Sequence, residues 1–261
     1  MSAGHRPRKR FGQNFLHDRH TIDRIVAAIA PRPGDAMVEI GPGRGALTVP
    51  LLRACGELEA VEMDRDLIAT LQETCAPHGT LRLHQADALT FDVTSCHHGA
   101  DLRLVGNLPY NISTPLIFHL LDTAHAIRDM HFMLQREVVD RMTAGPGSRI
   151  YGRLSVMTQY HCRVERLFTV APGAFHPVPA VESAIVRLTP HPPGETSAEE
   201  AEQLARVVAT AFAQRRKTVR KTLRGLLDEA ALERCGVNPG SRPEALGLEA
   251  FRRLAAEASH P

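Results

Sequence analysis

Residues 36–45 have the sequence AMVEIGPGRG, in which a short apolar segment runs directly into a glycine-rich loop. The segment 36–40 is apolar and bounded by glycine, which favours a buried strand. The three glycines of the loop allow a tight turn and let a ligand approach the backbone closely. Ala46 then takes the last position of the dinucleotide-binding pattern G-x-G-x-x-G, which accepts alanine there. The loop favours a cofactor site, although an ordinary glycine turn can have the same sequence.

Outward from this loop, strand-like and helix-like segments alternate along the chain. Strand patterns occur at 57–62, 81–84, 102–106 and 130–134, and helical patterns at 46–55, 64–76 and 114–122. This alternation predicts an α/β domain with a parallel sheet and helices on both of its faces. Two later strand candidates, 163–170 and 183–188, are close enough to pair at an edge of the sheet.

The domain boundary is predicted from a proline-rich segment at 189–194, which is typical of a linker. Ser197 and the glutamate three residues later form a capping-box signature, and the chain looks helical from there to its end. We therefore expect an α/β domain over 1–190, with a mobile basic extension at 1–10, and a small all-helical domain over 191–261.

The composition is that of an ordinary globular protein, with 43 % hydrophobic and 23 % charged residues. No segment approaches the roughly 18 apolar residues of a membrane span, and no apolar stretch follows the basic N-terminus as in a secretion signal. The five cysteines form no CxxC pair and the fourteen histidines are scattered, so we expect no metal. We expect a cytoplasmic protein without membrane contact, and a monomer because no dimer seam is evident.

The net charge of +2 conceals two basic segments. The segment 206–224 contains seven basic residues and no acidic one, and the segment 6–24 is also predominantly basic. Such segments indicate a polyanionic partner, or else two solvated faces. Charge alone leaves both interpretations open.

Two acids follow the second and third predicted strands. Glu62 ends the strand at 57–62, and Asp87 follows the strand at 81–84. A carboxylate at Glu62 can accept hydrogen bonds from both hydroxyls of a ribose, and one at Asp87 can accept from the amino group of adenine. Since the carboxyl ends of parallel strands share one edge, these acids and the glycine loop predict a site for an adenosine-containing cofactor. Alternatively, both acids are simple helix caps.

The fourth strand ends in Asn107-Leu108-Pro109-Tyr110, which favours a methyl donor over a nicotinamide cofactor. An exocyclic adenine amine is a poor nucleophile, because its lone pair is delocalised into the ring. The Asn107 side-chain oxygen and the Leu108 carbonyl can accept hydrogen bonds from the amine and localise that lone pair. Pro109 stiffens the turn, and Tyr110 offers a flat face on which the base can stack. The alternative is an ordinary turn.

Several further segments are similar to motifs of a known family. They are FGQNFL at 11–16, LQREVVDRM at 134–142, YGRLSV at 151–156, FHPVPAVESA at 175–184 and QRRKTVRK at 214–221. The tetrapeptide 107–110 resembles the motif of adenine-N6 methyltransferases that act on nucleic acid. Together, and in this order over nearly the whole chain, the segments resemble the small-subunit ribosomal RNA adenine dimethyltransferases.

The resemblance implies the class I methyltransferase fold, a Rossmann-like sheet of seven strands whose last strand is antiparallel. It implies S-adenosyl-L-methionine as methyl donor. The implied substrate is a pair of adjacent adenines in the 3′-terminal hairpin of 16S rRNA, within a 30S subunit or its late precursor. Each adenine would receive two methyl groups on N6, and the helical domain over 191–261 would bind rRNA.

The site residues that the resemblance implies fall into three groups. Those that would contact the cofactor are Asn14, Leu16, Gly41, Gly43, Glu62, Asp87 and Asn107. Those that would meet the target adenine are Asn107, Leu108, Pro109 and Tyr110, with Phe175 as a second aromatic face. The alternative for Phe175 is a place in the hydrophobic core. Those that would bind RNA, on a basic helix, are Arg215, Arg216, Lys217, Arg220 and Lys221.

Two other functions remain open at this point. One is a 23S rRNA adenine-N6 methyltransferase of the macrolide-resistance type, which shares the front domain but usually lacks such a C-terminal basic segment. The other is an RNA-binding 30S assembly factor without catalysis, against which the complete set of cofactor and amine-facing residues argues.

Overall fold

The computed structural model describes residues 14–96, 99, 101–214 and 216–259 of the 261-residue chain. The predicted basic extension at 1–10 lies outside these residues. The chain forms two compact units, of which unit 1 comprises 1–139 and 165–190 and unit 2 comprises 140–164 and 191–261. Within the described residues, no helix has both the length and the apolar character that a membrane span requires.

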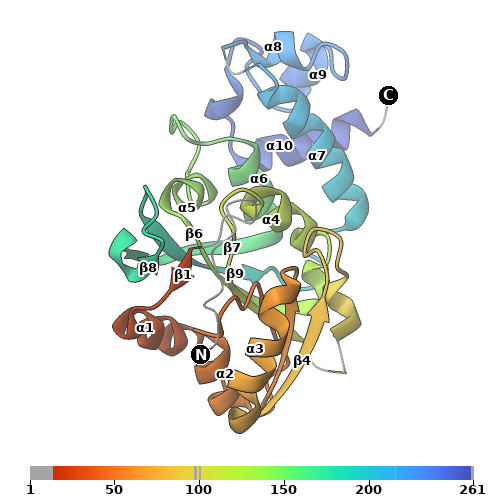
Figure 1. The fold of residues 1–261 in the computed structure, drawn as a ribbon. Coiled ribbons are helices and arrows are strands. Elements are labelled where there is room, and N and C mark those ends of the chain that lie inside the picture. The colour runs from red at the N-terminus through yellow and green to blue at the C-terminus, as the bar shows by residue number, and fades with distance from the viewer. Residues whose placement is uncertain (1–13, 97–98, 100, 215, 260–261) are drawn as a thin grey trace. The chain divides into compact units, whose positions relative to one another are not determined.

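Unit 1 is built on a seven-stranded sheet (Figure 1). In spatial order its strands are β4 (Thr80–Gln85), β3 (Glu57–Glu62), β2 (Met37–Ile40), β5 (Leu102–Asn107), β6 (Ile127–Gln135), β9 (Ser183–Pro190) and β7 (Cys162–Val170). The strands from β4 to β6 pair in parallel, and β9, the last along the chain, is antiparallel to β6. The predicted α/β fold with seven strands is confirmed, as is the pairing of the two late strands at one edge.

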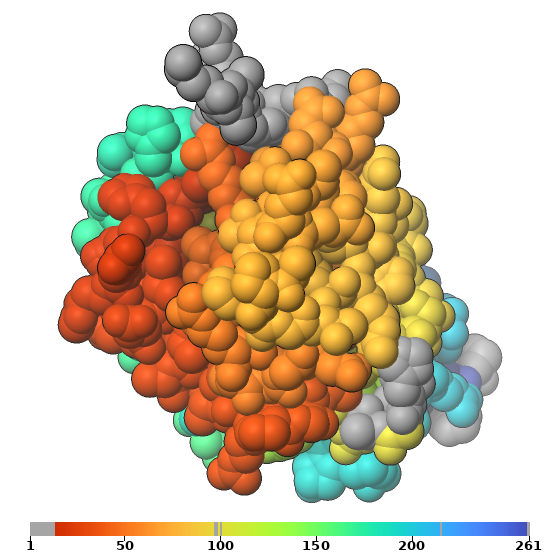
Figure 2. Space-filling model, turned by 60° about the horizontal axis from the view of Figure 1, so that its bottom comes forward, coloured from red at the N-terminus to blue at the C-terminus, as the bar shows by residue number. Residues whose placement is uncertain are grey.

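Helices cover this sheet. They are α1 (Arg19–Ile29), α2 (Thr48–Cys55), α3 (Arg65–Cys75) and α4 (Ser113–Leu121), with short 3-10 turns η2 (Ala76–His78), η3 (Val93–Cys96), η4 (Ala124–Ala126) and η5 (Pro172–Ala174). Side chains of α1, α2 and α3 share one hydrophobic core with residues from β2, β5, β6 and β9. The face of the molecule in Figure 2 shows these N-terminal segments, red to orange, next to the yellow segment that includes β4. The capping of α3 is local, because the Asp64 side chain accepts a hydrogen bond from the backbone N–H of Asp66.

A second, two-stranded sheet ties the N-terminal segment to the late part of unit 1. It pairs β1 (Phe15–Leu16) with β8 (Phe175–His176) in antiparallel register, Leu16 opposite Phe175. Leu16 and Phe175 are both buried in the core that α1 to α3 share. The pairing therefore fixes the segment around Asn14, which the sequence assigns to the cofactor site, against the body of unit 1.

Gly106 lets β5 approach β2 closely. A Cβ atom at this position would collide with the backbone carbonyl of Ile40, the last residue of β2. Since backbone atoms of a central strand cannot move away without breaking the ladder, only glycine fits there. Asn107, the next residue, is thereby held beside the loop that follows β2.

Unit 2 is helical. Its elements include α6 (Arg153–His161), α7 (Ala198–Phe212), α8 (Val219–Thr222), α9 (Glu229–Arg234), η6 (Pro243–Ala245) and α10 (Leu248–Ala258), and α5 (Arg136–Met142) leads into it. In its core, the rings of Phe212 and Phe251 lie with centroids 5.7 Å apart. Tyr160 of α6 also donates to Glu200 of α7 at 3.1 Å.

The extent of unit 2 differs from the predicted boundary at residue 190. Residues 140–164 pack with the C-terminal helices, because Tyr151 and Tyr160 bury their rings there. The helical unit is thus assembled from two separate parts of the chain, which a boundary drawn along the sequence does not capture.

Candidate active site

A cavity of about 320 Å³ lies at the carboxyl ends of β2, β3, β4 and β5 in unit 1. Its volume is within the range of small-molecule sites. The predicted site residues that line it are Asn14, Leu16, Gly41, Gly43, Glu62, Asp87, Asn107, Leu108, Pro109 and Tyr110. The structure therefore brings together segments that are up to 96 positions apart, from Asn14 to Tyr110.

The glycine loop forms one wall. Gly43 has φ of 57°, in the left-handed region that favours glycine. Its backbone N–H donates to Glu62 Oε2 at 3.2 Å, and a Cβ atom there would lie 3.2 Å from the Phe15 ring. The loop thus lies against both the acid of β3 and the N-terminal segment, and a side chain at Gly43 would disturb both contacts.

Glu62 is held at the end of β3 by two backbone donors. Besides Gly43, the N–H of Asp64 donates to Glu62 Oε1 at 2.8 Å. Burial raises the pKa of the Glu62 carboxyl, and these hydrogen bonds counteract that rise. Asp64, not Glu62, caps α3. The alternative interpretation of Glu62 as a simple helix cap is therefore wrong.

Asp87 lies beyond the end of β4, in a turn. Its Oδ1 accepts the backbone N–H of Leu89 at 3.0 Å. No helix starts at this turn, so the local hydrogen bond orients the carboxylate without making it a helix cap. Asp87 and Glu62 line the same cavity from adjacent strands.

Asn107 is oriented by the N-terminal segment. Its Nδ2 donates to the backbone carbonyl of Asn14 at 3.0 Å. Since a carbonyl accepts and does not donate, this contact determines which end of the amide is nitrogen. The amide oxygen is therefore not used by this contact, and Asn107 itself lines the cavity.

Tyr110 is oriented by β9. Its hydroxyl lies 2.7 Å from Oγ of Ser183, a fully buried residue at the start of that strand. Burial raises the pKa of the Tyr110 phenol. The hydrogen bond anchors the end of the ring, and Leu108 and Pro109 complete the same stretch of the cavity wall.

Phe175 does not take the predicted place. Its side chain is 0 % exposed and lies in the core with Leu16 and Val170, outside the residues that line the cavity. The antiparallel pair of β1 and β8 places Phe175 opposite Leu16, which directs the ring inward. Of the two predicted aromatic faces, only that of Tyr110 lies at the cavity.

Glu39 and Met63 are among the lining residues that the sequence did not predict. Glu39 is 2 % exposed, lines the cavity, and its Oε2 has no hydrogen-bond partner within the described part of the chain. Burial raises the pKa of Glu39 to about 7, and the nearby charge of Glu62 adds to the rise. Met63 is 52 % exposed at the cavity. An acid within an otherwise apolar strand was the available signal for Glu39.

The predicted RNA-binding residues belong to unit 2. Arg215 lies outside the described residues, and Arg216, Lys217, Arg220 and Lys221 are exposed. They do not form one basic helix as predicted: α7 ends at Phe212, and α8 is a single turn that begins after Thr218. Thr218 has extended backbone, as a helix-capping residue does, and so separates the two. Arg220 also pairs with Glu229 at 3.3 Å.

Comparison with known proteins gives close relatives over nearly the whole chain. The family model described as ribosomal RNA adenine dimethylase matches residues 4–259. A protein named ribosomal RNA small subunit methyltransferase A from Nitrosococcus oceani is 58 % identical over 97 % of this chain and 96 % of its own length. One of the same name from Pseudomonas putida is 59 % identical over 96 % of this chain and 94 % of its own.

Two solved structures superimpose on most of this chain. The 23S rRNA methyltransferase ErmE superimposes with a TM-score of 0.73 at 28 % identity, covering 95 % of this chain and 100 % of that one. A dimethyladenosine transferase from Plasmodium falciparum gives a TM-score of 0.75 at 24 % identity, covering 92 % of this chain and 95 % of that one, and shows the fold alone.

Proposed function

Because the chain belongs to the ribosomal RNA adenine dimethylase family, we propose that it is an S-adenosyl-L-methionine-dependent dimethyltransferase of 16S rRNA. Its substrate is a pair of adjacent adenines in the 3′-terminal hairpin, each of which receives two methyl groups on N6. The observation that carries this proposal is the position of Asn107 and Tyr110, at the wall of the same cavity as the glycine loop, Glu62 and Asp87.

The lining residues of the cavity support binding of the methyl donor. Glu62 would accept the ribose hydroxyls and Asp87 the adenine amino group, while the loop around Gly43 allows close approach to the backbone. Glu39 offers a buried carboxylate oxygen that lacks a partner within the described residues. When bound, S-adenosyl-L-methionine supplies an electrophilic methyl group on a sulfonium, which leaves as a neutral thioether.

The chain's own contribution to the reaction is to prepare the adenine amine. With its Nδ2 held by Asn14, the amide of Asn107 presents Oδ1 as a hydrogen-bond acceptor. Oδ1 and the Leu108 carbonyl would accept hydrogen bonds from the N6 amine, which draws the nitrogen toward tetrahedral geometry and localises its lone pair. After methyl transfer the cationic nitrogen would release its proton to water. The rate then depends on alignment and on stabilisation of the charge that develops at nitrogen, without a strong general base.

Tyr110 would hold the target base after it leaves its stack. An extruded base stacks on an aromatic face, which in single-strand binding is worth roughly 1–3 kcal/mol. The Ser183 hydroxyl anchors the Tyr110 ring at 2.7 Å, so the stacking surface is in place before the base arrives. Tyr110 is the stacking residue in this proposal, and Ser183 is a positioning residue.

The degree of similarity favours 16S over 23S rRNA. The relatives named for the small subunit share 58–59 % of residues with this chain, whereas ErmE shares 28 %. The C-terminal unit does not separate the two classes, because the superposition with ErmE covers 95 % of this chain. A purely structural assembly factor would have no need for the arrangement of Asn14, Asn107 and the two acids.

The remaining aspects of the proposal concern the partner and its location. The exposed basic residues Arg216, Lys217 and Lys221 would contact rRNA phosphates and set register without reading bases. The enzyme would act as a cytoplasmic monomer on a 30S subunit or its late precursor.

The test is a methyl-mapping experiment with two substrates. Unmethylated 30S subunits and protein-free 23S rRNA are each incubated with the full chain and S-adenosyl-L-methionine, and rRNA fragments are analysed by mass spectrometry. We expect dimethyladenosine at two adjacent positions near the 3′ end of 16S rRNA only. Methylation confined to 23S rRNA, or none in either RNA, would refute the proposal.

A further inference from the structure

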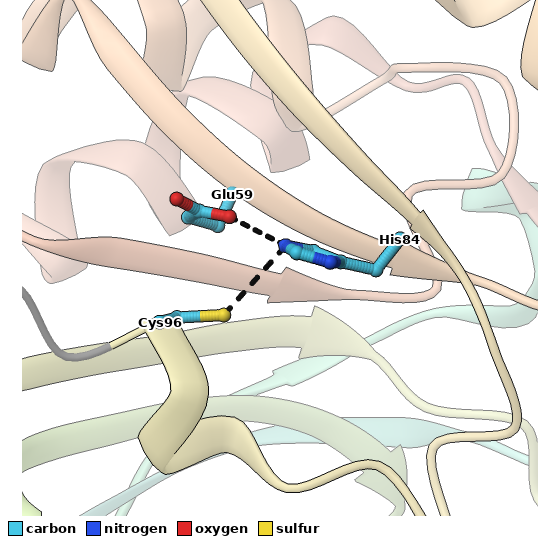
Figure 3. A group of neighbouring side chains, drawn as sticks. All are labelled: Glu59, His84 and Cys96. Carbon is cyan, nitrogen blue, oxygen red and sulfur yellow. Dashed lines mark hydrogen bonds and ion pairs between the residues drawn. The ribbon is translucent and has the colours of Figure 1, made fainter.

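Three potential metal ligands meet in unit 1 outside the active-site cavity. They are Glu59 on β3, His84 on β4 and Cys96 at the end of η3 (Figure 3). One ligand atom from each lies within 4.8 Å of the others, and none of the three residues lines the cavity. This cluster has no part in the proposed methyl transfer.

The two contacts of His84 converge on one ring nitrogen. His84 Nε2 lies 2.5 Å from Glu59 Oε2 and 3.8 Å from Cys96 Sγ (Figure 3). This nitrogen carries either a proton or a lone pair. It can therefore donate to the Glu59 carboxylate or accept from the Cys96 thiol, and one protonation state does not satisfy both.

A cation bound among the three side chains would interact favourably with all of them. Its positive charge attracts the lone pair of the imidazole, the carboxylate oxygen and a thiolate at the same time. From the geometry we propose that Glu59, His84 and Cys96 form a zinc site, with water in the fourth position. Thiolate, imidazole and carboxylate are the three ligand types of protein zinc, whereas Mg²⁺ and Ca²⁺ take oxygen ligands only.

Of the distances between the proposed ligand atoms, the one from His84 to Cys96 agrees with bound zinc, and the one from His84 to Glu59 would have to increase. Tetrahedral zinc with ordinary bond lengths separates a nitrogen from a sulfur ligand by about 3.6 Å, and a nitrogen from an oxygen ligand by about 3.4 Å. The observed His84–Cys96 separation of 3.8 Å is close to the first value. The carboxylate of Glu59 must withdraw from its 2.5 Å contact with His84 when the metal binds.

The surroundings support an ordered site with access from solvent. Cys96 is 2 % exposed, whereas the His84 side chain is 35 % exposed, which leaves a route for the ion. The ring of Phe91 packs on His84 with centroids 5.0 Å apart and restrains its orientation. Arg82 contacts Glu59 through the other oxygen, Oε1, at 3.4 Å, so the carboxylate can bridge arginine and metal.

A metal at this site would cross-link the segment that follows Asp87 to the sheet. This segment leaves β4 after Gln85, and its η3 turn brings Cys96 close to Glu59 and His84. A metal that joins Cys96 to β3 and β4 would cross-link both ends of it. Zinc would therefore raise the thermal stability of the whole chain, and it would do so without contact with the methyl-transfer site.

The experiment uses the full chain stripped of metal with a chelator, and Co²⁺ and Zn²⁺ as probes. Wild type should bind one equivalent of Co²⁺ with a thiolate-to-cobalt charge-transfer band, which Zn²⁺ displaces. Cys96→Ser and His84→Gln should lose the band and bind Zn²⁺ at least tenfold more weakly. Cys55→Ser is the matched control, because Cys55 is also buried but donates only to backbone carbonyls, and it should retain the band.

A second measurement is the thermal stability of the chain with and without Zn²⁺. Zn²⁺ should raise the unfolding temperature of the wild-type chain, and the rise should be absent in Cys96→Ser. A wild-type chain without the cobalt–thiolate band would overturn the proposal. Binding that survives unchanged in Cys96→Ser would also overturn it, because the metal would then be held by other histidines.

Discussion

The hydroxyl of Tyr110 lies 2.7 Å from Oγ of Ser183, so the residue that would receive the target base is anchored to the first residue of the antiparallel strand β9. Ser183 is fully buried and Tyr110 lies at the cavity. This hydrogen bond joins two parts of unit 1 that are 73 positions apart. The position of β9 in the sheet therefore determines how the Tyr110 ring is oriented.

Ser183→Ala should lower kcat about tenfold and leave KM for the RNA nearly unchanged. The Tyr110 ring would lose the hydrogen bond that orients it, but its aromatic face would still be available to the base. Tyr110→Phe removes the same hydrogen bond, and the double variant should be no worse than the more damaged single variant. Ser155→Ala, at an equally buried serine of unit 2, is the control and should affect stability without this change in kcat. Additive losses in the double variant would contradict the anchoring role.

Asp87→Asn should weaken S-adenosyl-L-methionine binding by about 1–3 kcal/mol, since a charged acceptor of the adenine amine is lost. Asp92→Asn is the matched control. Like Asp87, Asp92 accepts the backbone N–H of the residue two positions on, but it lies outside the cavity. Isothermal titration calorimetry on both variants checks this. Equal affinities of Asp87→Asn and Asp92→Asn for S-adenosyl-L-methionine would show that Asp87 only stabilises its own turn.

Glu39 should make the stability of the free protein decrease as pH rises. Burial raises its pKa in the folded state to about 7 from an ordinary value of 4.5, so the folded state binds this proton more tightly than the unfolded state. The associated stability is complete below pH 4.5 and is lost as pH rises through 7, by up to about 3 kcal/mol.

Glu39→Gln should therefore flatten the dependence of unfolding free energy on pH between 4.5 and 7. Urea unfolding at several pH values provides the measurement. Glu73→Gln, on the exposed side of α3, should leave the profile of the wild type intact. A Glu39→Gln profile parallel to that of the wild type would show that Glu39 does not titrate in this range.

Substitution of Arg216 and Lys221 by alanine should reduce the salt dependence of RNA binding by about one unit of slope per lost phosphate contact. Arg234→Ala is the control, because Arg234 is exposed in the same unit but pairs with Glu257 at 2.5 Å. The slope is measured by filter binding to 30S subunits over a range of salt. An unchanged slope would identify the basic segment as a solvated face.

The parallel sheet and the place of the cavity follow from local signals. The strand that ends at Ile40 is apolar and precedes glycines, and the acids Glu62 and Asp87 follow the next two strands. Because parallel strands align their carboxyl ends, patterns separated along the chain predict one site. The cavity confirms that placement for both acids and for Asn107.

The features that could not be predicted depend on contacts distant in sequence. The strands β1 and β8 have two residues each and no periodic pattern, so their pairing, and with it the burial of Phe175, is decided by tertiary packing. The same holds for Tyr160, whose partners in unit 2 come from after the linker. The proximity of His84 to Cys96 likewise results from the path of the chain after β4, and no sequence spacing predicts it.

The central claim is that Asn107, oriented by Asn14, prepares the adenine amine for methyl transfer. The most direct measurement is the single-turnover rate of methyl transfer to unmethylated 30S subunits, followed by mass spectrometry of the rRNA, for wild type and Asn107→Ala. We predict that Asn107→Ala unfolds at the wild-type temperature but transfers methyl groups at least ~10²-fold more slowly. A folded Asn107→Ala enzyme that transfers at close to the wild-type rate would contradict the account.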